Sequence, residues 1–186
     1  MRAALLAARR AVTAQVHDAE ADALRGHLAE VAGRGQTVCA YVPIRFEPGS
    51  IALLDKLLQL GTRVLLPVAR TDADGVPMPM RWGLYVPGAL VPARLGLQEP
   101  QGPWLPADAI AEAATVLVPA LAVDRAGVRL GRGAGFYDRT LPLARPAARL
   151  VAVVRDDELV DAIPAEPHDV PMTHAVTPRA GIIALG

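Results

Sequence analysis

The stretch TVCAYVPIRFEPGSIALLDKLLQLGTRVLLP, residues 37–67, decides the fold class of this chain. Two short apolar runs within it, residues 37–42 and 63–66, lack the alternation of a half-exposed strand and are typical of strands buried on both faces. Between them, the leucines of residues 51–60 form one apolar face at helical spacing, and Gly61 marks the end of that helix. A strand, a helix and a second strand in succession predict a parallel pair joined by a right-handed crossover.

The rest of the chain extends this pattern into one layered α/β domain. Further buried apolar runs occur at residues 115–118 and 149–154, and the first thirty or so residues have the apolar spacing of two amphipathic helices. A proline-rich middle segment is too short for a second domain, and the alternation in residues 78–84 indicates an edge strand. We therefore expect residues 1–186 to form a single three-layer domain in which helices flank a mainly parallel sheet.

Composition excludes several classes of protein. The 19 basic and 19 acidic residues cancel, so neither a nucleic acid nor a membrane surface is the expected partner. Apolar residues make up 52% of the sequence, but no run has the length of a membrane span, and the opening MRAALLAARR is too short for a secretory signal. We expect a cytoplasmic monomer. Its single cysteine, Cys39, lies in an apolar run and is expected to be buried and inert.

Three of the predicted strands run into a proline, namely Pro43, Pro67 and Pro119. Proline cannot donate to a central strand ladder, so each one marks the point where a strand gives way to a loop. In a parallel sheet these exits share one edge, and ligands of open α/β sheets bind there. Glu47 and the residues 124–139 follow such exits and are the first candidates for a site. By its position alone, Glu47 can also be read as a solvated loop carboxylate.

The segment DRAGVRLGRGAGFYDR, residues 124–139, has four glycines and four arginines in sixteen residues. Alternate glycines across residues 131–135 let backbone N–H groups approach a ligand closely, and the residues after Gly135 can start a helix whose N-terminus favours an anion. The guanidinium groups of Arg129 and Arg132 suit phosphate oxygens. The segment therefore predicts a polyphosphate-binding loop, although it matches neither the Walker A nor the dinucleotide pattern. A structural turn in an arginine-rich sequence is the alternative.

A bound polyphosphate usually brings Mg²⁺, which prefers one or two carboxylates together with phosphate oxygens and water. Asp138 directly follows the glycine-rich segment and is the first predicted ligand. Asp169, which lies after the fourth predicted strand, is the second. The histidines do not have the dense spacing of a zinc site.

At these residues the chain resembles the 5-formyltetrahydrofolate cyclo-ligase family, also called methenyltetrahydrofolate synthetases. The family signature is an apolar strand ending in Val-Pro and then Gly-x-Arg-Leu-Gly-x-Gly-x-Gly-Tyr-Tyr-Asp, and residues 117–139 read LVPALAVDRAGVRLGRGAGFYDR. Weaker similarity covers nearly the whole chain. The resemblance implies an α/β fold of the NagB/RpiA/CoA-transferase-like type. It also implies ATP- and Mg²⁺-dependent conversion of 5-formyltetrahydrofolate to 5,10-methenyltetrahydrofolate, with phosphorylation of the formyl oxygen and release of ADP and phosphate.

The resemblance also implies roles for particular residues. Arg2 matches the arginine of the family's opening Lys-x-x-Leu-Arg, and Arg132 would follow the transferred phosphoryl group. Glu47 would contact the reduced folate and orient its N10, while Asp138 and Asp169 would hold Mg²⁺. Nine consecutive residues would wrap the ATP phosphates: Arg129, Leu130, Gly131, Arg132, Gly133, Ala134, Gly135, Phe136 and Tyr137.

Two alternatives remain at this point. Trp82, with Met78 and Met80, would supply an apolar wall for the folate ring, or it would pack in the core as part of an edge strand. The chain as a whole would be the enzyme or, as the second hypothesis, a non-catalytic module that binds a nucleotide or sugar phosphate. A module that only binds phosphate needs neither Glu47 nor two metal-binding carboxylates, so we favour the enzyme.

Overall fold

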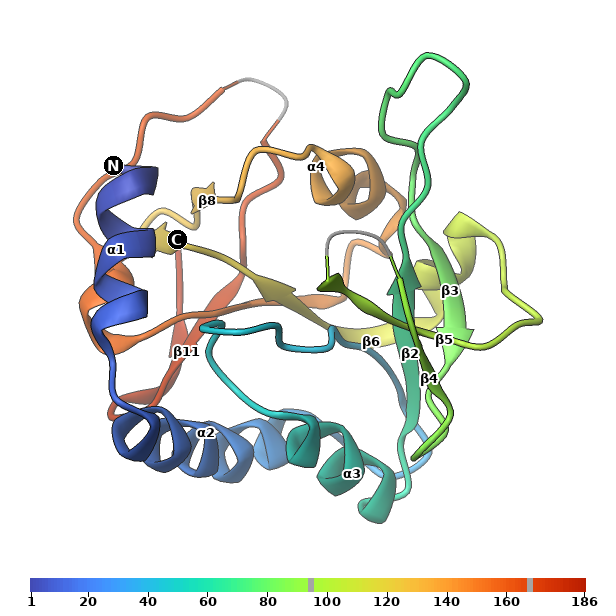
Figure 1. Ribbon diagram of the computed structural model, residues 1–186, viewed down its shortest axis with the longest axis horizontal. Coiled ribbons are helices and arrows are strands. Elements are labelled where there is room, and N and C mark those ends of the chain that lie inside the picture. The colour runs from blue at the N-terminus through green and yellow to red at the C-terminus, as the bar shows by residue number, and fades with distance from the viewer. Residues whose placement is uncertain (94–95, 167–168) are drawn as a thin grey trace.

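The computed structural model describes residues 1–93, 96–166 and 169–186, and within these ranges a seven-stranded sheet forms the centre of the molecule (Figure 1). The strand order is β12-β11-β9-β6-β1-β2-β3. The strands of this sheet are β1 (Thr37–Cys39), β2 (Arg63–Val68), β3 (Arg81–Leu84), β6 (Ala113–Pro119), β9 (Arg149–Val153), β11 (His174–Thr177) and β12 (Gly181–Ala184). The neighbours from β11 through β2 pair in parallel, whereas β3 and β12 pair antiparallel at the two edges. The predicted mainly parallel sheet is confirmed.

The predicted strands are confirmed with shifted ends. The run at residues 37–42 leaves the ladder after Cys39, and its last regular bond is the Ala40 amide to the Leu65 carbonyl, at 2.8 Å. The alternating segment 78–84 becomes the antiparallel edge strand β3, which starts at Arg81. Residues 40–47 are therefore irregular backbone beyond the end of β1.

Helices α1 (Arg2–Ala11), α2 (Ala14–Leu28) and α3 (Ile51–Gln59) confirm the helical expectations. Figure 1 shows α2 and α3 side by side beneath one face of the sheet. Their buried leucines pack with alternate strand residues such as Val38 and Val64. Each leucine taken from water contributes about 1.5–3 kcal/mol, so apolar burial holds this layer in place. Helix α1 stands apart from this pair, beside β8 (Arg129–Leu130).

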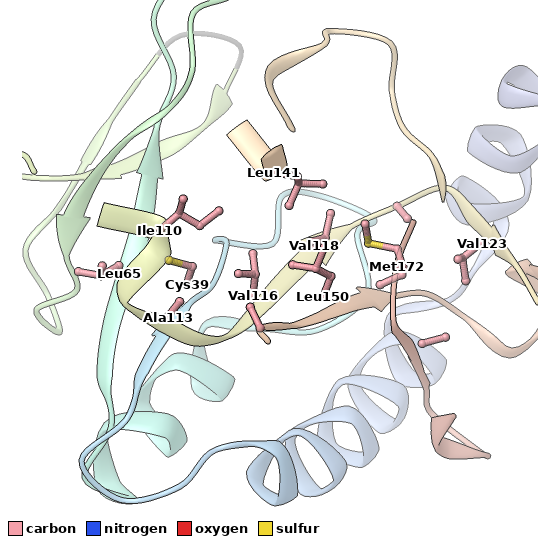
Figure 2. Close-up of a cluster of buried hydrophobic side chains, with 14 of the residues drawn as sticks. Cys39, Leu65, Ile110, Ala113, Val116, Val118, Val123, Leu141, Leu150 and Met172 are labelled. Carbon is pink, nitrogen blue, oxygen red and sulfur yellow. The ribbon is translucent and has the colours of Figure 1, made fainter. Parts of the chain in front are cut away.

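The opposite face of the sheet carries the intervening strand residues. Figure 2 shows Cys39, Val116, Val118 and Leu150 gathered there with Leu141 above them. Cys39 is buried, as predicted. The short helix α4 (Phe136–Thr140) and the 3-10 helices η3 (Ala107–Glu112) and η4 (Leu141–Leu143) belong to this side of the molecule.

The remaining elements lie outside the central sheet. A small three-stranded sheet consists of β7 (Ala122–Asp124), β8 and β10 (Leu159–Val160), and a separate hairpin consists of β4 (Leu90–Pro92) and β5 (Gln98–Pro100). Two more 3-10 helices are η1 (Ala29–Val31) and η5 (Asp156–Glu158). Throughout the described ranges, no helix combines the length and the apolar character that a membrane crossing requires.

Candidate functional site

A cavity of about 260 Å³ opens where β1, β2 and β6 end. Its walls come from the segments that follow these strands, from β5, and from residues 131–138. Most of this lining is apolar, with Val42, Pro67 and Met80 among its members. The predicted position of the site, at the carboxyl ends of the parallel strands, agrees with this cavity.

The hairpin β7–β8 aims the glycine-rich segment at the cavity. Asp124 is buried at its turn, where Oδ1 accepts the amides of Ala126 and Val128 and Oδ2 accepts the amide of Ile163. Gly127 completes the turn in the left-handed region with φ +88°, and a Cβ there would lie 2.3 Å from the carbonyl oxygen of Met172. The turn thus depends on a carboxylate and a glycine that do not themselves line the cavity.

Residues 131–138 curve along the cavity wall. Gly133 and Gly135 have φ values of +93° and +78°, which side chains other than glycine rarely adopt. Gly131 is constrained differently, because a Cβ there would lie 2.7 Å from Nη1 of Arg129. A helix starts after Gly135 as expected, but α4 has only 5 residues. The backbone turns and the arginines, more than a helix dipole, therefore define this wall.

Arg129, Tyr137 and Asp138 form a contact set inside the segment. Nη2 of Arg129 lies 2.5 Å from Oδ1 of Asp138, and the guanidinium lies 5.6 Å from the centre of the Tyr137 ring. Within the described part of the chain, Nε of Arg129 and the hydroxyl of Tyr137 are buried with no hydrogen-bond partner. Burial raises the pKa of Tyr137, so the hydroxyl stays protonated. An unpaired buried donor costs about 1–3 kcal/mol, which a ligand oxygen would relieve.

Glu47 and Arg132 meet across the cavity wall. Oε1 of Glu47 lies 3.1 Å from Nε of Arg132, and the Ile44 amide donates to Oε2 at 3.1 Å. The Glu47 side chain is 9% exposed and that of Arg132 is 44% exposed, so a buried carboxylate faces a cation that solvent reaches. Burial raises the pKa of Glu47, against the opposing effects of the Ile44 amide and Arg132. The reading of Glu47 as a solvated carboxylate is wrong.

Helix α1 brings two arginines to this region. Nε of Arg2 donates to the carbonyl of Gly131 at 3.0 Å, which places Arg2 against the predicted phosphate-binding segment. Arg9 lines the cavity, where its Nη2 donates to the carbonyl of Ala120 at 2.5 Å and its Nε pairs with Glu158 at 2.6 Å. Arg9 was missed by the sequence analysis. Its distance of seven residues from Arg2 on an amphipathic helix, two full turns, is the signal that could have found it.

Glu99 is a second missed residue. Its buried carboxylate lines the cavity from β5 and accepts the amide of Ala69 at 3.1 Å. Nη1 of Arg70 lies 2.9 Å from each of its oxygens, and the Arg70 guanidinium stacks 4.6 Å from the centre of the Trp104 ring. Glu99 is therefore held rigidly at the end of the cavity near β2.

Two predicted residues lie elsewhere. Trp82 is fully buried in the core, and its Nε1 donates to the carbonyl of Ala107 at 3.2 Å. Asp169 accepts the amide of Glu166 at 2.8 Å. Among the described residues, neither lines the cavity, whereas Met80 does. The position of Trp82 fits the core interpretation and does not support contact with a folate ring. The structure does not bring Asp169 to the cavity wall that carries Asp138.

Comparison with known proteins gives consistent matches. A family model described as "5-formyltetrahydrofolate cyclo-ligase family" matches residues 1–178. A 5-formyltetrahydrofolate cyclo-ligase of Mycolicibacterium smegmatis is 65% identical over 185 residues, which cover 100% of this chain and 95% of the relative. The protein of that name from Escherichia coli K12 is 31% identical over 143 residues, 76% of this chain and 78% of the relative. The solved structure of Aquifex aeolicus 5,10-methenyltetrahydrofolate synthetase has a TM-score of 0.77 at 21% identity, covering 99% of this chain and 90% of that chain, and supports the fold.

Proposed function

The chain belongs to the 5-formyltetrahydrofolate cyclo-ligase family and is an enzyme of that activity, and we propose that it couples ring closure to the cleavage of ATP with Mg²⁺. The observation that carries this proposal is the contact between the buried carboxylate of Glu47 and the partly exposed guanidinium of Arg132 inside one cavity. A non-catalytic phosphate-binding module has no need for such a carboxylate, and the family membership favours the enzyme.

The chemistry explains why a phosphoryl donor is needed. The N5-formyl group is an amide, and its oxygen is a poor leaving group. The formyl oxygen attacks the γ-phosphorus, an O–P bond forms, and the bond to the β-phosphate oxygen breaks to release ADP. N10 then attacks the activated carbon and loses its proton, and the C–O bond breaks to release phosphate and leave the 5,10-methenyl ring. An enzyme for this reaction mainly positions reactants and neutralises charge.

We assign the phosphate-binding role to Arg2 and to the segment from Arg129 to Tyr137. The support is the pair of unmatched buried donors, Arg129 Nε and the Tyr137 hydroxyl, which suit anionic oxygens. Arg132 is the residue proposed to follow the transferred group, because its side chain is largely exposed. When the phosphate chain binds, Arg132 would exchange part of its contact with Glu47 for phosphate oxygens.

Glu47 is proposed to contact the folate and orient N10. The Ile44 amide fixes the Glu47 side chain, and Nε2 of His17 lies 3.1 Å from the backbone carbonyl oxygen of Glu47. Burial raises the pKa of its carboxyl group toward the range where a carboxylate accepts protons effectively. Glu47 is thus suited to accept the proton that N10 loses during ring closure.

The donor set near the phosphate-binding segment fits one protein ligand for Mg²⁺. Asp138 lines the cavity, and its carboxylate is 33% exposed. When bound, the ion would offset the negative charge of the phosphate oxygens, and Asp138 would share its carboxylate between the ion and Arg129. Within the described residues, no group of three or more His, Cys, Asp or Glu side chains is placed to hold a metal. A one-carboxylate site agrees with the usual preference of Mg²⁺ for phosphate oxygens and water. The role of Asp169 as a second ligand stays a prediction.

The proposal is tested by mixing the purified chain with 5-formyltetrahydrofolate, ATP and Mg²⁺ and following the near-ultraviolet absorbance of the methenyl product. We expect product in equal amount to the ADP released, and no product when ATP is omitted or when a chelator removes Mg²⁺. Product formed without ATP, or ADP released without product, would contradict it. Reduced folate is the proposed substrate. The cytoplasmic location, the monomeric state, and the absence of nucleic-acid and membrane partners stay predictions.

A further inference from the structure

The cavity holds a second buried carboxylate that the reaction scheme above leaves without a role. The Glu99 side chain is 6% exposed, yet it lines the cavity from β5, an element separate from the phosphate-binding segment. Resting on the proposed function, we propose that Glu99 recognises the 2-amino group of the pterin ring and so sets both the orientation of the folate and the preference for it.

Sheet order places the three polar groups in sequence along the cavity. The phosphate-binding segment follows β6, Glu47 follows β1, and Glu99 is bonded to the amide of Ala69, which directly follows β2. The strands lie in the order β6-β1-β2, so Glu47 stands between the other two. The ends of β6 and β2 are two strand spacings apart, which is roughly 10 Å. A folate whose formyl group faces Glu47 and the phosphate-binding segment therefore extends its ring toward Glu99.

The chemistry around Glu99 suits the pyrimidine edge of a pterin. Pro67, Met80 and Leu97 supply apolar walls that a flat ring can contact. The carboxylate accepts the Ala69 amide at Oε1 and Nη1 of Arg70 at both oxygens. An ionised carboxylate has about four acceptor positions, so the contacts made by the described residues leave one position on Oε2 for a ligand N–H. The 2-amino group offers such a donor.

Hydrogen-bond polarity sets the orientation of the folate. The glutamate tail carries carboxylates that only accept hydrogen bonds, and Glu99, whose charge is already paired with Arg70, also only accepts, so the two do not match. The 2-amino group of the pterin donates and is favoured at the same place. We infer that the pterin occupies the Glu99 end and that the glutamate tail leaves through the cavity mouth.

The test compares 5-formyltetrahydrofolate with an analogue that has a methyl group in place of the 2-amino group. For the unmodified enzyme we expect kcat/KM to be at least tenfold lower with the analogue, as one charge-assisted hydrogen bond predicts. Glu99→Met is expected to raise KM for the natural folate about tenfold and to remove the preference between the two substrates, with KM for ATP unchanged. Dissociation constants of both folates without ATP provide a second readout.

Arg70→Ala is the matched control, because it breaks the same ion pair but keeps the carboxylate. Arg70→Ala should retain the preference for the 2-amino substrate. If the ion pair had only a structural role, Arg70→Ala and Glu99→Met would have the same effect on this preference. Equal use of both folates by the unmodified enzyme would overturn the inference even if Glu99→Met did not fold. Failure of the unmodified enzyme to convert the natural folate would count against the proposed function instead.

Discussion

Arg9 and Glu158 lie 149 positions apart in the chain, and their side chains form an ion pair of 2.6 Å from which water is almost entirely excluded. A second contact of 2.7 Å joins Arg9 Nη2 to Glu158 Oε2, and the Arg155 amide donates to the same oxygen. This pair fastens α1 to the edge of the cavity. Arg2, at the other end of α1, reaches the carbonyl of Gly131. The position of the N-terminal helix and the shape of the phosphate-binding segment are therefore linked.

Removing one partner of this pair should be costly. Arg9→Met leaves the Glu158 carboxylate buried without its cation, and we expect the free energy of unfolding to fall by about 3–5 kcal/mol. Denaturant titration measures the change, and Arg10→Met, an exposed position on the same helix, is the control. The double variant Arg9→Met/Glu158→Met should recover much of the loss, because no lone charge remains. Equal destabilisation by Arg9→Met and Arg10→Met would show that the ion pair does not hold the helix.

Arg132 tests the phosphate-binding segment. Its side chain is 44% exposed and, among the described residues, pairs with Glu47, so Arg132→Ala should lower the melting temperature far less than Arg9→Met, although it leaves the Glu47 carboxylate without its cation. Turnover is expected to fall at least a hundredfold, as for other residues that neutralise transferring phosphoryl groups (on the order of 10³-fold). Steady-state kinetics supply the measurement, and Arg145→Ala, an exposed arginine beyond α4, serves as the comparison. An Arg132→Ala enzyme with normal kcat would remove this residue from the mechanism.

The raised pKa of Glu47 predicts that kcat/KM depends on pH. Its pKa is raised by burial, and the proposed base works only when ionised, so kcat/KM should fall as the pH drops through a value above the ordinary glutamate pKa. Glu47→Gln should keep ATP binding, slow ring closure and abolish this acidic limb of the profile. Loss of nucleotide binding in Glu47→Gln would instead place the residue at the phosphates.

The same shift has a consequence for stability. A carboxyl group whose pKa is higher in the folded state favours folding when protonated and opposes it once ionised. Its unfavourable contribution therefore grows as the pH rises from the ordinary glutamate pKa through the raised value. Unfolding titrations at several pH values should show Glu47→Gln gaining stability relative to the parent as the pH rises across that window. A constant difference between the two proteins would mean that the shift is absent.

Local patterns were sufficient for five of the seven strands of the central sheet, but not for β11 and β12, and for most of the phosphate-binding wall. The run from Thr37 to Pro67 carries its strand, helix and strand in apolar spacing that depends only on near neighbours. Glycine at 133 and 135 likewise reflects backbone angles of those residues themselves. Arg129 was predicted at the site because a guanidinium suits phosphate oxygens, but its contact with Asp138 was not predicted.

The parts that were missed depend on contacts between distant segments. Arg9 becomes a cavity residue only because Glu158 fixes it, and Glu99 only because the β4–β5 hairpin folds back on the end of β2. Trp82 was ambiguous for a related reason. The register of an edge strand decides whether a residue faces the core or a ligand. Trp82 pairs with Pro67 in the β2–β3 ladder, and the residues next to Trp82 in the sequence do not determine this pairing.

Gly127 gives the sharpest test of how the cavity wall is positioned. Its φ of +88° is unfavourable for other residues, and a Cβ would meet the Met172 carbonyl oxygen at 2.3 Å, so Gly127→Ala should both strain the turn and push the segment around Met172 away from the hairpin. We expect a loss of roughly 2 kcal/mol or more in unfolding free energy, as for strained backbone elsewhere, together with reduced activity. Gly26→Ala is the control, because Gly26 lies in α2 and a Cβ there would meet nothing within 4 Å. That variant should gain up to about 1 kcal/mol with unchanged kcat. If both alanine variants were equally stable and active, the β7–β8 turn would not be what aims the arginines at the cavity.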